Sequence, residues 1–449
     1  MTFHIDMPQN VVDIIERLEN AGYEAFAVGG CVRDAALGRI PHDWDITTSA
    51  LPEEVKALFR RTIDTGIKHG TVTIMIQNEG YEVTTYRIDG KYQDHRRPDS
   101  VNFTRSLEED LKRRDFTINA MAYSESKGLV DLFGGISDLH AHIIRCVGKA
   151  DDRFNEDALR ILRAVRFAAQ LGFVIDKETQ DAARHHAEDL SAVSAERVEA
   201  ELTKILLSEH PEEIDEAYSL GITKIILPEY DRMAETPQNN PYHIYDVGRH
   251  TIEVIRNIPA DKVLRYTALF HDSGKPDAKT TDENGIDHFK GHNVLSEEIA
   301  KKVCRRLKMD NDTTRDVAKL VYWHDFGLTG GIKKVTLRKA ISRMGIEYFD
   351  SFIAVRRADM AGQSDYKKDE SIEIVNKLIE MKDEIVRDND ALKISDLKIG
   401  GADLIGAGVP RGPEMGKILK NLLEYVIENP ELNQKEILIE KVKKIIAEK

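Results

Sequence analysis

The sequence changes character near residue 145, and this change limits the folds that the chain can adopt. Before that point, an amphipathic stretch at 11–22 predicts a helix that ends at a glycine. β-branched and aromatic runs predict strands within 23–30, 43–47, 70–76 and 81–88. After that point, apolar residues recur at helical spacing to the end of the chain. We therefore expect an α+β protein in which a small mixed-sheet head precedes an all-α remainder.

The length of 449 residues exceeds what one ordinary core holds, so several domains are expected. A Pro- and Asn-rich stretch at 237–242 suggests one boundary, and changes in pattern suggest the others. The predicted parts are 1–145, 146–236, 237–362 and 363–449. The last of these parts is helical and charged, and its residues show no pattern typical of a chemical site.

Composition excludes several classes of protein. No apolar run approaches the roughly 18 residues that span a bilayer, and the N-terminus does not read as a secretory signal. The three cysteines are far apart, which favours a reducing, cytoplasmic setting and gives no zinc motif. The net charge of −14 argues against a generally basic coat for nucleic acid. A local basic stretch remains at 145–166, which contains six basic and four acidic residues.

Two short motifs near the N-terminus indicate phosphate chemistry. Gly29 and Gly30 follow a predicted strand and precede a predicted helix, where backbone N–H groups can approach a phosphate and Arg33 can add a cation. Asp43 and Asp45 alternate on a predicted strand, so both carboxylates face one side. Two hard oxygen ligands suit Mg²⁺ and phosphoryl transfer. Separately, each motif is more often a tight turn or a surface feature.

Together, GGCVRDAALG and DWDIT resemble the class II tRNA nucleotidyltransferase and bacterial poly(A) polymerase family. The resemblance covers roughly 20–230, because further blocks follow in the family's order: EVTTYR (82–87), 89–122, DLFGG (131–135) and EDALRILRAVRF (156–167). It implies a nucleotidyltransferase head at 1–145 and a helical neck and body at 146–236. It also implies Asp43 and Asp45 as catalytic Mg²⁺ ligands, with CTP, ATP and the tRNA 3′ end as partners.

A second pair of residues suggests how a base is chosen. Asp157 and Arg160 are three residues apart on a predicted helix and so share a face. Cytosine and adenine both present an amine donor beside a ring-nitrogen acceptor, which an aspartate and an arginine match. Uracil and guanine reverse this pattern. The resemblance implies this role for the pair, although a salt-bridged helix would show the same spacing.

Other positions take their roles from the resemblance. Arg114 matches the position that contacts the nucleotide, and Arg163 and Arg166 either hold the triphosphate or orient the base-reading pair. Whether Asp115 or Glu82 supplies a further carboxylate stays open. The loop at 89–103 is complete, which favours an enzyme able to add A, including one that adds only A.

Histidines and aspartates in the third part indicate a second site. The motifs at 248–250, 270–276, 289–292, 323–325 and 356–360 resemble the HD metal-dependent phosphohydrolase superfamily. The resemblance implies an HD-type helical domain at 237–362 that holds a transition metal. Its ligands would be His250, His271, Asp272 and Asp359, with His292 and His324 for a second metal. The alternative is a region that mainly grips RNA.

We therefore expect a cytoplasmic enzyme that adds or repairs the 3′-terminal CCA of tRNA. Three alternatives stay open: a poly(A) polymerase or A-adding enzyme, a phosphohydrolase, and a non-catalytic RNA-binding protein. The last is disfavoured because clustered carboxylates repel an RNA backbone unless a cation lies between them. The sequence does not indicate an oligomeric state.

Overall fold

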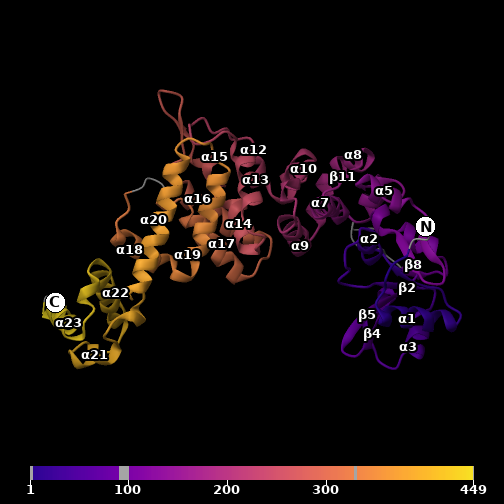
Figure 1. Ribbon diagram of the computed structural model, residues 1–449, viewed down its shortest axis with the longest axis horizontal. Helices are drawn as coiled ribbons and strands as arrows, with labels where there is room; N and C mark the ends of the chain where they lie inside the picture. Colours follow the sequence, from indigo (N-terminus) through magenta and orange to yellow (C-terminus); the bar gives the residue numbers. More distant parts are fainter. Residues whose placement is uncertain (1–3, 91–100, 328–330, 448–449) are drawn as a thin grey trace. The chain divides into compact units, whose positions relative to one another are not determined.

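The computed structural model describes residues 4–90, 101–327 and 331–447. The chain forms two compact units (Figure 1). Unit 1 comprises Met1–Asp231 with Arg306–Met309, and unit 2 comprises Arg232–Arg305 with Asp310–Lys449. The four-part division made from the sequence is finer than these units and stays a prediction. Within the described ranges, no helix has both the length and the apolar character that crossing a bilayer requires.

The head of unit 1 is built on one mixed sheet whose strands run in the order β3-β4-β5-β2-β1-β8-β9. Only the β2–β5 pair is parallel among the described pairs of this sheet. The strands are β1 Ala25–Val28, β2 Ile46–Thr48, β3 Thr62–Gly66, β4 Thr71–Ile76, β5 Glu79–Thr85, β8 Met121–Ser124 and β9 Gly128–Asp131. The helices are α1 Gln9–Asn20, α2 Gly30–Ala36, α3 Pro52–Leu58, α4 Leu107–Lys112 and α5 Gly135–Ala141.

Most of the predicted head elements are confirmed. The helix within 11–22 is α1, which buries its apolar face, and the strands within 23–30, 70–76 and 81–88 are β1, β4 and β5. β4 and β5 form a hairpin that turns at Gln77 and Asn78, both with positive φ. The strand placed at 43–47 is wrong at its start, because β2 begins only at Ile46. Asp43 and Asp45 therefore lie in the segment that leads into β2.

A separate strand pair, β6 Arg87–Asp89 and β7 Val101–Phe103, flanks the predicted loop at 89–103. Residues 91–100 of that loop lie outside the described residues, so the expectation that the loop is complete stays a prediction.

After the head, unit 1 becomes helical, as predicted. Its elements are α6 Ala150–Glu156, α7 Leu159–Leu171, α8 Lys177–His185, α9 Ala195–Leu206, α10 Ile214–Ser219, α11 Thr223–Ile226 and the parallel pair β10 Ile143–Ile144 and β11 Val174–Ile175. The next helix, α12 Pro228–Ala234, begins in unit 1 and ends in unit 2. α7 is buried over most of its length and ends at Gly172, with φ 69°. The helix predicted from residue 155 is interrupted, because Asp157 takes an extended conformation between α6 and α7.

A short segment from later in the chain completes unit 1. Arg306 donates to both carboxylate oxygens of Glu229, each at 2.7 Å, and Leu307 and Met309 are buried. Because these residues cluster with unit 1, the chain passes between the two units three times.

Unit 2 is helical, as the sequence predicts. Its elements are α13 Val247–Asn257, α14 Lys262–Phe270, α15 Lys275–Ala278, α16 His292–Arg306, α17 Asn311–Trp323, α18 Lys334–Met344, α19 Phe349–Ala361, α20 Lys368–Arg387, α21 Gly401–Gly406, α22 Pro413–Glu428, α23 Lys435–Ala447 and the small pair β12 Thr280–Thr281 and β13 Asp287–His288. One core lies around α18–α20, and a second core joins α21–α23 (Figure 1). The α+β prediction is thus confirmed for the whole chain.

Candidate active site

The glycine turn after β1 lies directly against an arginine. Gly29 has φ 81°, and a Cβ atom added to it would lie 2.8 Å from Nη1 of Arg114. The positive backbone angle favours glycine at this position, and any side chain there would displace the end of Arg114. From the adjoining α2, Arg33 donates through Nη1 to Oδ1 of Asn119 at 2.7 Å. The fold thus brings the glycine turn, Arg33 and Arg114 together, as the sequence indicates.

Asp43 and Asp45 lie on the solvent side of the segment beside this turn. Burial alternates along it: Trp44 and Ile46 are buried, whereas Asp43 and Asp45 are exposed. The backbone N–H of Val28 donates to the carbonyl oxygen of Asp45 at 2.9 Å, which fixes Asp45 next to the end of β1. The two carboxylates therefore share the exposed side, although Asp43 and Asp45 precede the strand instead of belonging to it.

The electrostatics of Asp45 reflect its two charged neighbours. Partial desolvation raises the pKa of its carboxyl group; Arg114 opposes this shift and Asp43 adds to it. Two neighbouring carboxylates facing solvent repel each other, and a hard divalent cation relieves that repulsion. The donor set therefore fits Mg²⁺.

Two other head carboxylates are engaged by the protein itself. Asp110 is fully buried and accepts from Arg113 at 2.8 Å; burial alone would raise its pKa, but Arg113 and Arg114 lower it. Oδ2 of Asp115 accepts from Nε of Arg163 at 2.8 Å. Its Oδ1 accepts from the backbone N–H of residue 116 and from the side chain of residue 119. Asp115 therefore anchors α7, while Glu82, the other open position, is exposed on β5.

Asp157 and Arg160, the two residues expected to read the base, are held by other side chains in this structure. Oδ2 of Asp157 accepts from Nη2 of Arg197 at 2.7 Å. Nη1 of Arg160 donates to Glu156 at 2.5 Å, and its Nη2 donates to the carbonyl oxygen of Arg113 at 2.9 Å. The expectation that Asp157 and Arg160 share one helix face is wrong, because Asp157 precedes α7. They are instead neighbours at a helix junction.

The two remaining arginines of α7 are not equivalent. Arg163 pairs with Asp115, whereas Arg166 is buried, pairs with Glu201 at 2.8 Å and lies 3.8 Å over the ring of Phe167. Burial, reinforced by Arg163, lowers the pKa of Arg166 to about 10. The sequence analysis missed Glu201 and Arg197 as partners. Their four-residue spacing on α9 was the available signal.

Unit 2 gathers a second group of side chains. Every residue assigned from the HD resemblance meets here: His250, His271, Asp272, His292, His324 and Asp359. Asp272 stands in the middle. Its Oδ2 lies 3.2 Å from Nε2 of His271, and its Oδ1 lies 3.3 Å from Nε2 of His292. Asp359 places Oδ1 3.1 Å from Nε2 of His250.

The four imidazoles are oriented by backbone carbonyl groups. Each Nδ1 lies within hydrogen-bond distance of one carbonyl oxygen, at 3.0 Å for His250, 2.7 Å for His271, 2.8 Å for His292 and 2.6 Å for His324. Because a carbonyl only accepts, each Nδ1 carries the proton and each Nε2 presents a lone pair. Nε2 of His250 lies 3.2 Å from that of His271, and Nε2 of His292 lies 3.1 Å from that of His324. Facing lone pairs at this distance fit bound cations.

A lysine that the sequence analysis did not single out joins this group. Nζ of Lys275 lies 2.7 Å from Oδ2 of Asp272 and donates to the side chain of Gln238 at 2.6 Å. Its position three residues after Asp272, in FHDSGKP, was the signal that could have found it. Lys275 balances part of the charge of the buried carboxylate.

Family comparisons match separate parts of the chain. Residues 25–145 match the "Poly A polymerase head domain", and residues 172–233 match the "Probable RNA and SrmB- binding site of polymerase A". Residues 288–442 match domain 2 of tRNA nucleotidyltransferases. With the glycine turn and paired aspartates, these matches define the class as a nucleotidyltransferase with a poly(A) polymerase-type head.

Comparisons with single proteins narrow this class. A CCA-adding enzyme from Ligilactobacillus salivarius is 35% identical over 448 residues, which are 98% of this chain and 97% of that enzyme. One from Lactiplantibacillus plantarum is 57% identical over 198 residues, 44% of this chain and 49% of that enzyme. The crystal structure of Bacillus stearothermophilus CCA-adding enzyme in complex with CTP has 31% identity and a TM-score of 0.70, covering 98% of this chain and 97% of that one. The chain belongs to the family of CCA-adding enzymes.

The ion pair between Asp115 and α7 generates a stability prediction. Replacing Arg163→Met leaves the buried carboxylate of Asp115 without its cation, which should cost about 3 kcal/mol of unfolding free energy. Urea denaturation measures this loss, and adding Asp115→Asn to the variant should recover much of it. Arg184→Met, which removes an arginine from an exposed ion pair, should change stability little. Equal effects of the two single variants would contradict the buried-pair account.

Proposed function

We propose that this chain adds or repairs the 3′-terminal CCA of tRNA from CTP and ATP, without a nucleic-acid template. The observation that carries the proposal is the position of Asp43 and Asp45 beside the Gly29 turn and Arg114. The same unit carries Asp157 and Arg160, so catalytic and base-reading groups belong to one compact body. Membership of the CCA-adding family supports this reading. Three free, buried cysteines are in keeping with a cytoplasmic setting.

The catalytic roles follow from charge and position. Asp43 and Asp45 would hold Mg²⁺, which activates the primer 3′-hydroxyl and stabilises charge on the leaving pyrophosphate. The Gly30 N–H at the start of α2, Arg33 and Arg114 would bind the triphosphate. In the part of the chain that the structure describes, Nε of Arg114 is buried without a hydrogen-bond partner. A phosphate oxygen would satisfy it.

Base selection would use Asp157 and Arg160, whose side chains are paired with other residues in this structure. The carboxylate of Asp157 accepts from the exocyclic amine of C or A, and Arg160 donates to the ring nitrogen. Each must exchange part of its present pairing, with Arg197 and Glu156 respectively, for the base. Arg166, which is buried and paired with Glu201, and Arg163, which pairs with Asp115, would either orient this pair or hold the triphosphate.

The role of the paired aspartates has a direct test. Asp43→Asn or Asp45→Asn should lower nucleotide incorporation by about a thousandfold or more, because several kcal/mol of metal-dependent stabilisation is lost. Incorporation of labelled CTP into tRNA lacking its CCA measures this effect. Asp64→Asn, at an exposed position on β3, is the matched control and should retain activity. Near-normal activity of either active-site variant would overturn the proposal.

The base-reading role predicts a change in specificity. Asp157→Ala should reduce the preference for CTP and ATP over UTP and GTP by roughly tenfold to a hundredfold, because each unpaired buried polar group costs about 1–3 kcal/mol. Asp152→Asn, exposed on α6, serves as control. The substrates for this measurement are tRNAs that lack their last three, two or one nucleotides.

The same series of tRNAs, used with the unmodified enzyme, identifies the product. It distinguishes complete CCA addition from addition of A alone and from a long A tail, the product of a poly(A) polymerase.

The cluster in unit 2 favours a second activity, metal-dependent phosphoester hydrolysis. Lone pairs on four imidazoles and the carboxylates of Asp272 and Asp359 fit one or two transition-metal ions. A pocket of about 410 Å³ lies beside them, lined in part by His243, Gln363 and Lys367. Gln363 donates to Asp359 at 3.1 Å, so the pocket reaches the cluster. A bound metal would activate water, and Lys367 would attract a phosphate.

This second activity is separable from the first. Changing His271→Ala together with Asp272→Asn should lower hydrolysis of a 2′,3′-cyclic phosphate in the presence of Mn²⁺ or Ni²⁺ by about a hundredfold or more, since the bridging carboxylate and one imidazole are lost. CCA addition should continue. His288→Ala, exposed on β13, is the control for histidine removal within unit 2. If the unmodified enzyme binds these metals and hydrolyses nothing, the cluster is structural.

A further inference from the structure

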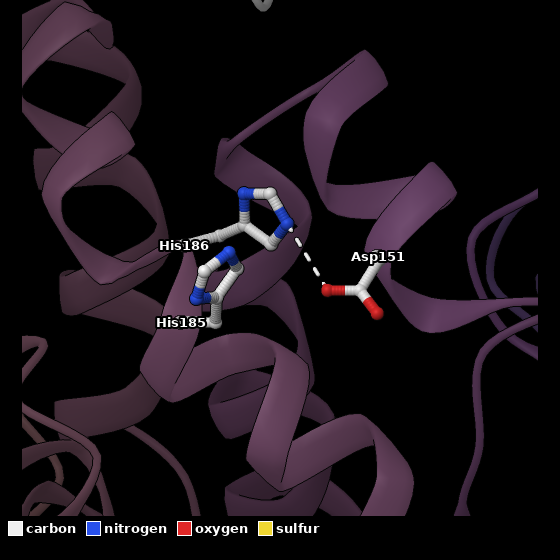
Figure 2. A group of neighbouring side chains, drawn as sticks. All are labelled: Asp151, His185 and His186. Carbon is white, nitrogen blue, oxygen red and sulfur yellow. Dashed lines mark ion pairs between the residues drawn. The ribbon is translucent and has the colours of Figure 1, made fainter.

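Unit 1 carries a group of metal-type donors that is distinct from both sets of residues described above. It consists of Asp151 on α6, His185 at the end of α8 and His186, which follows α8 (Figure 2). One donor atom from each residue lies within 4.8 Å of the others. None of these residues belongs to the glycine turn, the paired aspartates or the base-reading pair. We propose that they form a third site, which binds one borderline divalent transition-metal ion such as Zn²⁺.

One edge of the coordination polyhedron is already formed. Nε2 of His186 lies 3.3 Å from Oδ1 of Asp151, the pair joined by the dashed line in Figure 2. Ligands about 2.0–2.1 Å from a tetrahedral zinc ion are separated by roughly 3.3–3.4 Å, so this spacing needs no adjustment. The ring of His185 lies edge-on to that of His186, with centroids 4.9 Å apart and planes at 84°. His185 is exposed, so its side chain can rotate to close the third position.

A fourth residue orients the central imidazole. Nδ1 of His186 lies 2.8 Å from Oδ2 of Asp189, which is the arrangement of a carboxylate that accepts from a metal-binding histidine. With Nδ1 protonated toward Asp189, Nε2 of neutral His186 presents its lone pair to Asp151 and His185. A lone pair facing a carboxylate oxygen at 3.3 Å is repulsive unless a cation lies between them.

The competing explanation is that the cation is a proton. His186 would then be an imidazolium held between Asp151 and Asp189, and His185 would have no part in the arrangement. The metal proposal differs because it requires His185. Two nitrogen donors and one oxygen donor favour Zn²⁺, Co²⁺ or Ni²⁺ over Mg²⁺, which prefers oxygen. With only three protein ligands, the remaining positions would be filled by water.

At this location, a bound ion would link two helices of unit 1. Asp151 is in the first turn of α6, and the residue that caps the other end of α6 is Asp157. An ion shared with His185 and His186 would tie α6 to the end of α8. The base-reading aspartate would then extend from a helix fixed at its far end.

Metal stoichiometry of the full chain tests the proposal. Equilibrium dialysis against buffered Zn²⁺, followed by elemental analysis, should show one equivalent fewer for His185→Gln and for His186→Gln than for the unmodified chain. His140→Gln, exposed on α5 in the same unit, should bind as many ions as the unmodified chain. The histidine cluster of unit 2 is unchanged in all of these proteins, so its contribution cancels. The Co²⁺ visible spectrum should lose one component in the same two variants.

A fourth variant tests the orienting role. Asp189→Asn should keep the stoichiometry but weaken binding of this ion by about tenfold or more, the usual effect of losing a carboxylate behind a ligand histidine. Circular dichroism and CTP incorporation confirm that each variant is folded. Unchanged zinc stoichiometry in His185→Gln or in His186→Gln overturns the proposal. Unchanged stoichiometry in both variants assigns the group to a protonated ion pair, because an imidazolium held between Asp151 and Asp189 binds no zinc.

Discussion

The ion pair between Asp115 and Arg163 is the interaction on which the active site of unit 1 depends. It joins a carboxylate of the head to α7, the helix that also carries Arg160. Asp115 is buried and also receives hydrogen bonds from Asn119 and the Phe116 backbone; Asn119 in turn accepts from Arg33. One chain of polar contacts therefore connects the phosphate-binding turn to α7. Since a buried charge is costly without its partner, the two halves of the site keep their relative position.

In unit 2, backbone atoms hold the side chains of the second candidate site in position. Its imidazoles are oriented by backbone carbonyl oxygens, three of them from the residue three positions earlier and that of His250 from Gly362, so the fold itself sets which nitrogen faces inward. Asp272 lies between two pairs of these nitrogens, and a cation is needed to relieve the repulsion between its carboxylate oxygens and their lone pairs. The two units thus offer different donors: exposed carboxylate oxygens in the head are the type that hard ions prefer, whereas the largely buried imidazole nitrogens of unit 2 are the type that softer ions prefer.

Sequence patterns were sufficient for the fold class, most head elements, the family and the grouping of the HD residues. They failed at two places for one reason. Asp45 and Asp157 were assigned to regular elements because spacing alone cannot show where an element begins. The structure places each residue just before an element, Asp45 before β2 and Asp157 before α7. Partners such as Glu201 and Arg197 were missed because they come from α9, and contacts between helices depend on packing that periodicity does not encode.

The segment Arg306–Met309 has a consequence for evolution and for protein dissection. Although it follows α16 of unit 2, it clusters with unit 1, where Arg306 clasps Glu229 and Leu307 is buried. Unit 1 is therefore not a contiguous module. A chain ending at Asp231 would lose these residues and leave Glu229 without this arginine. Gene fusion or truncation at that boundary therefore cannot transfer unit 1 intact.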